Sequence, residues 1–152
     1  MNAYSKSFLQ IIPEAILYTS VDPASRLVIA ERVSGGITAG KATSYQSLFL
    51  GGEDNLIGYR QDRFAGQQML FNNLEGRLKL NDFFSYILPG QYGFSGFYDI
   101  GRVWVKRENS ETWHNGFGAG AYFSPSDMAL LKIKEGYSSE GFYTYLNFTL
   151  TF

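Results

Sequence analysis

Hydrophobic and polar side chains alternate along most of this chain with a period of two residues. The clearest stretch is residues 69–80, where four leucines point to one side and mostly polar or charged residues point to the other. Side chains two residues apart lie on the same face of a β-strand. The alternation therefore predicts an amphipathic strand that lies between an apolar environment and a wet one.

Six more stretches follow a similar pattern. Strands are expected at residues 27–39, 93–104, 116–123, 128–136 and 142–152, with a weaker one at 8–19 that Pro13 interrupts. Short turn-like segments lie at 88–90, 124–127 and 138–141, and the longest irregular stretch is about 42–66. The pattern predicts one all-β domain over residues 1–152, with about seven antiparallel strands.

The expected strands are long enough to cross a membrane but too few to close a barrel. The strand at 69–80 would have about twelve residues, more than is usual in soluble sheets and enough to cross a bilayer when tilted. Bacterial single-chain barrels have even strand counts of about eight or more. We therefore expect the C-terminal part of a larger transmembrane β-barrel, whose targeting segment and other strands precede Met1. The alternative is a small self-contained barrel with one strand undetected.

The amino-acid composition excludes or disfavours several classes of function. The 152 residues carry 13 Lys+Arg and 14 Asp+Glu, so no basic field favours nucleic acid. The chain has no Cys and one His, which excludes thiol catalysis and multi-histidine metal centres. Aromatic residues make up 17% and Gly numbers 17, while the mean hydropathy is only −0.15. This combination is typical of β-rich chains, including transmembrane barrels with aromatic girdles.

Three motifs occur in the order seen in one known family. Residues 93–101 (GFSGFYDIG) resemble the aromatic-x-Asp-x-Gly strand of the bacterial surface-antigen family, the BamA/TamA-type outer-membrane assembly barrels. Upstream, Gly51-Gly52 and the run 57–60 (IGYR) are similar to the Gly-Gly and aliphatic-Arg-Gly-aromatic loop of that family. Residues 73–77 (NLEGR) resemble its Asn-x-Glu-x-Arg strand. The ordered set is more specific than any one motif.

The resemblance implies a sixteen-stranded barrel, of which this chain supplies about the last seven strands. Its long loop, about 42–66, would fold into the lumen, where the loop arginine contacts lumenal carboxylates. Here Ile57 stands at that arginine position, and we hypothesise that Arg60 or Arg63 contacts Asp99 instead. The alternative is that Asp99 faces lumenal water.

The resemblance also implies sets of site residues. The loop motif comprises Gly51, Gly52, Ile57, Gly58, Tyr59, Arg60 and Arg63. The lumenal strand partners are Glu75, Arg77, Asp99 and Gly101. The C-terminal assembly signal is Phe148, Leu150 and Phe152.

The implied function is insertion or translocation of other outer-membrane proteins at a seam formed by residues 142–152. The expected location is the bacterial outer membrane. The partners would be membrane lipid, the missing N-terminal strands of the same barrel and client outer-membrane proteins, with no cofactor and no nucleic acid. A small barrel for an apolar ligand, or a degenerate fragment without function, are the alternatives.

Two charges lie on faces that are otherwise apolar. Glu31 falls on the apolar face of 27–39, and Arg102 on that of 94–104. Both would be tolerated at a membrane interface or beside a β-bulge.

The sequence does not favour an enzyme. His114 is the one candidate base, with Ser110 or Ser124 as imaginable nucleophiles, but a lone His at a loop–strand junction is usually a solvated polar residue. Glu75 and Asp99 could form a carboxylate pair but are better explained as partners of Arg77 and of the lumenal loop. Gly116, Gly118 and Gly120 share one strand face, which suits close packing or an inserted loop.

Overall fold

The protein is an antiparallel all-β structure, as its sequence pattern predicts. The computed structural model describes residues 8–40, 47–83, 89–105, 112–125 and 129–150. In this part of the chain, no helix is long and apolar enough to cross a membrane. The strands are β1 (Phe8–Ile11), β2 (Glu14–Ser20), β3 (Leu27–Gly40), β4 (Leu48–Leu50), β5 (Phe64–Gly66), β6 (Gln68–Phe83), β7 (Gly90–Trp104), β8 (His114–Pro125), β9 (Ala129–Ser138) and β10 (Gly141–Leu150).

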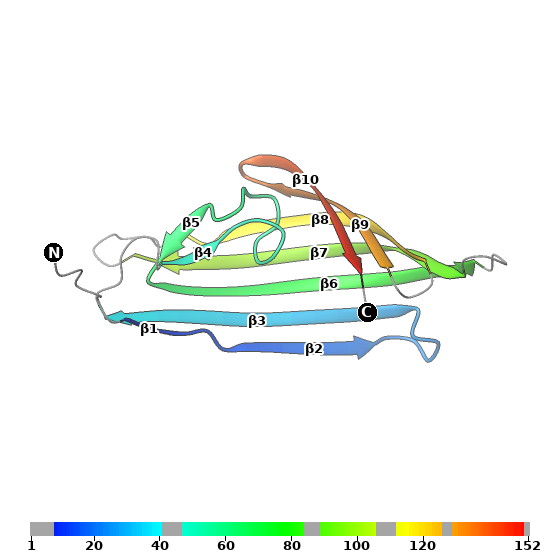
Figure 1. Ribbon diagram of the computed structural model, residues 1–152, viewed down its shortest axis with the longest axis horizontal. Helices are drawn as coiled ribbons and strands as arrows, with labels where there is room; N and C mark the ends of the chain where they lie inside the picture. Colours follow the sequence, from blue (N-terminus) through cyan, green and yellow to red (C-terminus); the bar gives the residue numbers. More distant parts are fainter. Residues whose placement is uncertain (1–7, 41–46, 84–88, 106–111, 126–128, 151–152) are drawn as a thin grey trace.

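One broad sheet contains all strands except β4 and β5 (Figure 1). Its order is β1-β3-β6-β7-β8-β9-β10, and β2 also pairs with β3. β1 pairs with the end of β3 and β2 with its beginning, so both lie along the same edge. The break between them falls at Ile12 and Pro13. This confirms the predicted interruption, because proline has no N–H to give to the ladder.

Strand ends differ from the predicted ends by a few residues. β6 continues to Phe83 rather than ending at Leu80, and β7 begins at Gly90 rather than at Gly93. The pairing of β6 with β7 shifts register between Lys79 and Asn81, which is a β-bulge or irregularity. Strict alternation of side chains fails across such a shift, so the pattern ended before the strand did.

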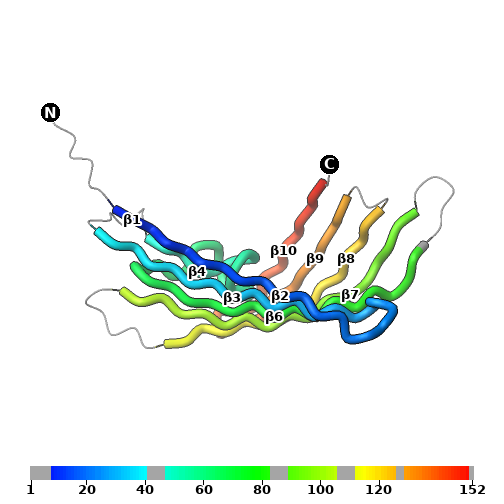
Figure 2. Tube along the Cα trace, turned by 90° about the horizontal axis from the view of Figure 1, so that it is seen from below, coloured from blue at the N-terminus to red at the C-terminus, as the bar shows by residue number. Residues whose placement is uncertain are grey.

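The sheet has two chemically different faces. Leu74, Tyr98, Phe117 and Tyr137 lie directly opposite one another across four strands and point to the convex side, called here the outward face. Their neighbours Asn73, Asp99, Gly116 and Ser138 form the matching row on the concave side, the inner face. Figure 2 shows the sheet bent into a trough with β4 on its concave side.

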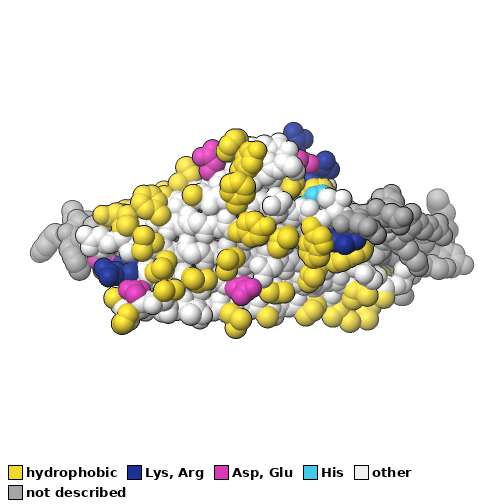
Figure 3. Space-filling view, turned by 180° about the vertical axis from the view of Figure 1, so that it is seen from behind, with side chains coloured by type: hydrophobic (Ala, Val, Ile, Leu, Met, Phe, Trp, Pro, Cys, Tyr) yellow, Lys and Arg dark blue, Asp and Glu magenta, His cyan; other side chains and the backbone are white. Residues whose placement is uncertain are grey.

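Large apolar side chains of the outward face are exposed. Examples on five strands are Val33 at 42%, Leu74 at 42%, Phe94 at 55%, Ile133 at 50% and Leu146 at 72%. Figure 3 views the molecule from behind and shows hydrophobic side chains spread along its length with few charges between them.

Neither Glu31 nor Arg102 on the outward face lies beside the bulge. Glu31 is paired in continuous register with Leu74, and Arg102 with Leu70. The bulge explanation is therefore wrong for both residues. The Glu31 carboxylate accepts a hydrogen bond of 2.9 Å from the side-chain amide of Asn72.

The sheet does not close on itself within the described residues. β10 pairs with β9 alone, and β1 and β2 pair with β3 alone. Each side of the sheet, β1 with β2 on one and β10 on the other, therefore ends in an unpaired edge, which lies open in Figures 1 and 2.

The segment 42–66 is not wholly irregular, which corrects the prediction. β4 and β5 pair antiparallel within it, and residues 47–66, called here the inner loop, rest on the inner face. Leu50 and Leu56 are fully buried there. They pack in one core with the following residues of the loop and of the strands: Leu48, Tyr59, Met69, Phe71 and Val103. The apolar side chains of the loop and of the inner face thus form a core together, which the open sheet alone would lack.

Candidate functional site

The candidate site is the inner loop together with the part of the inner face that it covers. Gly51, Gly52 and Gly58 shape the loop with φ values of +128°, +98° and +83°. Residues with a side chain rarely adopt these conformations, so the loop path requires glycine at these turns. The Gly51 N–H also donates to the Asn55 side-chain oxygen at 2.7 Å, which closes the first turn.

Asp99 holds the tip of the loop through a backbone group. Its Oδ2 accepts a hydrogen bond of 2.9 Å from the Ile57 N–H, and Asp99 is only 5% exposed. A carboxylate that accepts from a buried N–H makes a charge-assisted bond. Asp99 therefore faces the loop rather than open water, and the side chain of Ile57 need not be polar for this contact.

The two arginines suggested as partners of Asp99 lie elsewhere. Arg63 forms an ion pair with Glu140 in the β9–β10 turn, with 2.7 Å between Nε and Oε1. Arg60 is exposed. The hypothesis that Arg60 or Arg63 binds Asp99 is therefore wrong: the Asp99 carboxylate accepts from the Ile57 N–H, while Arg63 pairs with Glu140.

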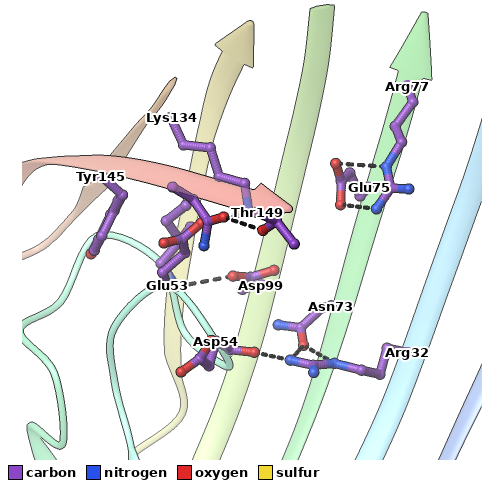
Figure 4. A network of polar contacts seen from close by, with 12 residues as sticks. Arg32, Glu53, Asp54, Asn73, Glu75, Arg77, Asp99, Lys134, Tyr145 and Thr149 are labelled. Atoms are coloured by element: carbon purple, nitrogen blue, oxygen red, sulfur yellow. Dashed lines mark hydrogen bonds and ion pairs between the residues drawn. The ribbon is translucent and has the colours of Figure 1, made fainter. Parts of the chain in front are cut away.

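A second attachment joins the loop to β3 and β6 (Figure 4). The Arg32 guanidinium donates to the Asn73 side-chain oxygen at 2.8 and 3.0 Å and also to the Asp54 carbonyl oxygen. The Asn73 amide in turn donates to the Asn55 carbonyl at 2.9 Å. Two loop carbonyls are thus satisfied by side chains from two neighbouring strands.

Charged pairs line the remaining inner face. Glu75 and Arg77 form a two-pronged ion pair on β6, with both N–O distances at 2.9 Å, as the sequence interpretation expected. Lys134 on β9 lies 3.3 Å from Glu53 of the loop. These pairs border an open cavity of about 350 Å³, which Lys132 also lines.

The β9–β10 hairpin bends over the loop and grips it. The Tyr145 hydroxyl on β10 accepts a hydrogen bond from the Gly58 N–H at 3.2 Å and donates to the Tyr59 carbonyl at 2.8 Å. Ser138 at the end of β9 donates its hydroxyl proton to the Gly58 carbonyl. Tyr59 is buried, and its own hydroxyl lies 3.3 Å from that of Ser139. We call this set of contacts, with the Arg63–Glu140 pair, the loop–hairpin clasp.

Glycines make room for the loop on the inner face. A Cβ at Gly116 would overlap the Ile57 carbonyl oxygen, and one at Gly136 would lie 2.6 Å from Ile57 Cγ1. At Gly101, a Cβ would come within 2.8 Å of the Leu50 side chain. The prediction that the glycines of β8 make room for an inserted loop is confirmed for Gly116. A Cβ at Gly118 would instead meet the Glu135 carbonyl of β9.

The residues of the expected C-terminal signal lie on the outward face where they are described. Phe148 is 64% exposed and Leu150 is 50% exposed. They stand opposite Leu131 and Ala129 of β9. Phe152 lies outside the described residues.

The residues considered for catalysis are engaged in other ways. His114 stacks on Phe64 with ring centroids 3.8 Å apart. Ser124 is at the opposite end of β8 and donates its hydroxyl to the Ala129 carbonyl at 3.0 Å. Ser110 lies outside the described residues. The carboxylates of Glu75 and Asp99 bind Arg77 and the Ile57 N–H.

Several contacts of the site were missed in the sequence. The side chains of Arg32, Asn73 and Tyr145 bind backbone groups of the loop. Backbone groups are alike in almost every residue, so the sequence does not show which of them a side chain will bind. The contact at Gly136 could have been predicted from the sequence. Gly136 lies two residues after the inward-facing Lys134, so it lies on the inner face, where the absence of a side chain leaves space for the loop.

Comparison of the chain with protein-family models finds no match, and comparison with curated proteins finds none either. What the chain does is therefore inferred from its residues and their geometry.

Proposed function

We propose that this chain forms part of the wall of a bacterial outer-membrane β-barrel that inserts or translocates other outer-membrane proteins. The observation that carries the proposal is the polarity of the two sheet faces. Apolar side chains cover the exposed outward face, whereas ion pairs and a hydrogen-bonded loop occupy the inner face. A soluble sheet would place these faces the other way round or cover the apolar one with a second layer.

Strand length supports a membrane environment. β6 has 16 residues and β7 has 15, well beyond the usual length in soluble sheets. A tilted strand of about ten residues already crosses the hydrocarbon core. Lipid would solvate the outward leucines and phenylalanines, which are too many and too contiguous for water.

The assembly role rests on the family resemblance and on the loop. The residues that resemble the family loop, Gly51 to Arg63, lie against the strand that resembles the aromatic-x-Asp-x-Gly strand, at Asp99. This juxtaposition supports an assembly barrel over a simple channel, with Ile57 as the departure from the family pattern.

The free edge of β10 supplies a place for a client strand. β10 pairs only with β9 within the described residues, so its other edge presents N–H and C=O groups in a row. An incoming β-strand would add to this edge by β-augmentation. The partners in this proposal are membrane lipid, the N-terminal strands of the same barrel and client outer-membrane proteins.

The polar inner face does not favour a barrel for an apolar ligand. The 350 Å³ cavity is bordered by Arg32, Glu75, Arg77, Asp99 and Lys134. An apolar ligand would have to desolvate these charges without replacing their hydrogen bonds.

The test uses the full protein refolded into phosphatidylcholine vesicles. A urea-unfolded eight-stranded outer-membrane barrel is added, and its folding is followed by its altered migration on gels without heating. We expect the client to fold faster than in protein-free vesicles and than in vesicles that hold an unrelated barrel. Equal rates in all three would contradict the assembly role. Failure of the protein itself to enter vesicles would contradict the membrane location as well.

A further inference from the structure

Arg102 is a cation on the outward face, where apolar residues dominate. It stands on β7 directly opposite Leu70 of β6, in a part of the ladder with continuous register. Two residues to either side, Ile100 and Trp104 point the same way. The position of Arg102 is thus a regular outward position near the end of β7, not a local distortion.

Both tryptophans of the chain lie at this arginine. The chain has two Trp residues. The Arg102 guanidinium carbon is 4.9 Å from the Trp104 ring centroid and 5.9 Å from that of Trp113. The two indole rings are themselves in edge contact at 6.3 Å. Tryptophan beside a cation at a strand end is the arrangement favoured at the boundary between hydrocarbon and lipid headgroups.

An apolar groove begins at the same tryptophan. Its volume is about 460 Å³, within the range of small-molecule sites. It is lined by Val33, Leu70, Phe71, Asn72, Ile100 and Trp113. The groove runs across β3, β6 and β7 on the outward face, with Arg102 beside its Trp113 end.

The two ends of the groove carry opposite charges. At the end away from Arg102, Asn72 donates its side-chain amide to the carboxylate of Glu31. An anionic group is attracted to the guanidinium end and repelled from the carboxylate end. A ligand with one anionic end and one apolar end therefore fits in a single orientation.

We propose that this groove and Arg102 form a binding site for an anionic membrane lipid, one whose phosphate headgroup carries a net negative charge. The acyl chain lies in the groove between Val33, Leu70 and Ile100, and the phosphate oxygens accept hydrogen bonds from the Arg102 guanidinium. Arginine suits this role because its planar donors match phosphate in a two-pronged geometry. The site rests on the proposed function, since it requires that the outward face be embedded in a bilayer.

Fluorescence of the two tryptophans reports on this site directly. The full protein is refolded into phosphatidylcholine vesicles that contain a small fraction of lipid brominated on its acyl chains, which quenches nearby indoles. The brominated lipid is phosphatidic acid in one series and phosphatidylcholine in the other. We expect phosphatidic acid to associate about fivefold more strongly than phosphatidylcholine at equal fraction, as one arginine at an anionic lipid implies.

Matched variants separate the site from the general charge of the protein. R102Q is expected to lose the preference for phosphatidic acid, and R102K to retain part of it. R26Q is the control, because Arg26 lies in the β2–β3 turn near the opposite strand end and pairs with Asp22. R26Q should keep the full preference. If R102Q fails to fold, a full preference in R102K still argues against the two-pronged phosphate contact.

The outcomes are distinct. Equal quenching by both lipids in the unaltered protein, or an unchanged preference in R102Q, would overturn the lipid site and leave the membrane location intact. Quenching by neither lipid would show that the tryptophans do not meet acyl chains. That result would overturn the membrane location and this site together.

Discussion

Asp99 shows how a side chain can hold the tip of a loop through a backbone group alone. Its carboxylate accepts the Ile57 N–H in a site that is almost fully buried. A buried N–H that loses its acceptor pays the full cost of desolvation, about 1–3 kcal/mol. The residue at position 57 is therefore free to be aliphatic, whereas the residue at position 99 must accept a hydrogen bond.

Replacing Asp99 should release the inner loop. In D99A the Ile57 N–H loses its acceptor, so we expect trypsin to cut after Arg60 or Arg63 about tenfold faster, with the products identified by mass spectrometry. D99N keeps an acceptor oxygen and should cause a smaller increase, whereas D99K should cause a larger one. Identical cleavage rates in D99A and the unaltered protein would contradict this role of Asp99.

A methyl group on the inner face should have the same effect by a steric route. In G116A the new Cβ overlaps the Ile57 carbonyl oxygen, and overpacking of this kind costs about 1–3 kcal/mol. We expect a raised rate of loop cleavage and a lower urea midpoint of unfolding. G76A is the control, because a Cβ at Gly76 has nothing within 4 Å. Equal effects of the two alanines would show that strand propensity, not the seat of the loop, is responsible.

At the scale of elements, the loop–hairpin clasp joins two parts of the chain that are distant in sequence. Tyr145 bridges the Gly58 N–H and the Tyr59 carbonyl, and the Arg63–Glu140 pair lies at the tip of the hairpin. The exposed ion pair contributes little, about 0–1 kcal/mol. The tyrosine hydroxyl, which satisfies two backbone groups, is the stronger part of the clasp.

Removing that hydroxyl should loosen the hairpin as well as the loop. In Y145F we expect hydrogen exchange at the Gly58 amide to rise about two- to tenfold, as the loss of one net hydrogen bond implies. Exchange in β10 should rise with it. Y143F removes a hydroxyl from the same strand and the same face and should leave Gly58 unchanged. A rise confined to Gly58, with β10 unaffected, would contradict coupling between loop and hairpin.

The sequence predicted the elements whose two faces differ and missed those whose signal is short or lies in the backbone. β6 and β10 alternate over ten residues or more, because one face meets an apolar environment and the other a polar one. β4 and β5 have three residues each, too few for a period to be visible. Asp99 was identified as a loop partner from the resemblance, but its true partner, the Ile57 N–H, could not be read because every residue except proline has one.

At the scale of the whole molecule, the environment of the outward face distinguishes a membrane-embedded sheet from a soluble one. Ile133 on β9 is half exposed, and its neighbour Lys132 points inward. An exposed position in water tolerates a charge with little effect on stability. The same position in lipid does not, because arginine near the bilayer midplane costs about 2–4 kcal/mol.

I133R therefore tests the environment of the wall. We expect it to reduce refolding into phosphatidylcholine vesicles and to lower the free energy of unfolding there by about 2–4 kcal/mol, measured by denaturant titration. K132R, which places arginine one residue away on the inner face, should refold normally. Normal refolding of both variants would contradict burial of this face in lipid.

Because of the clasp, how firmly the loop is attached also depends on how much of the chain has been synthesised. Its contacts from Gly58, Tyr59 and Arg63 reach partners 87, 86 and 77 residues later in the sequence. During synthesis, the loop emerges long before β10, and the Tyr145 hydroxyl becomes available to it only when the β9–β10 hairpin has been made. A chain cut short before Glu140 would lack Tyr145 and the Arg63–Glu140 pair, so its loop would be held less firmly and cleaved more readily. The attachment of residues 51–63 thus distinguishes chains that include β10 from chains that stop before it, by the same few hydrogen bonds that hold the folded state.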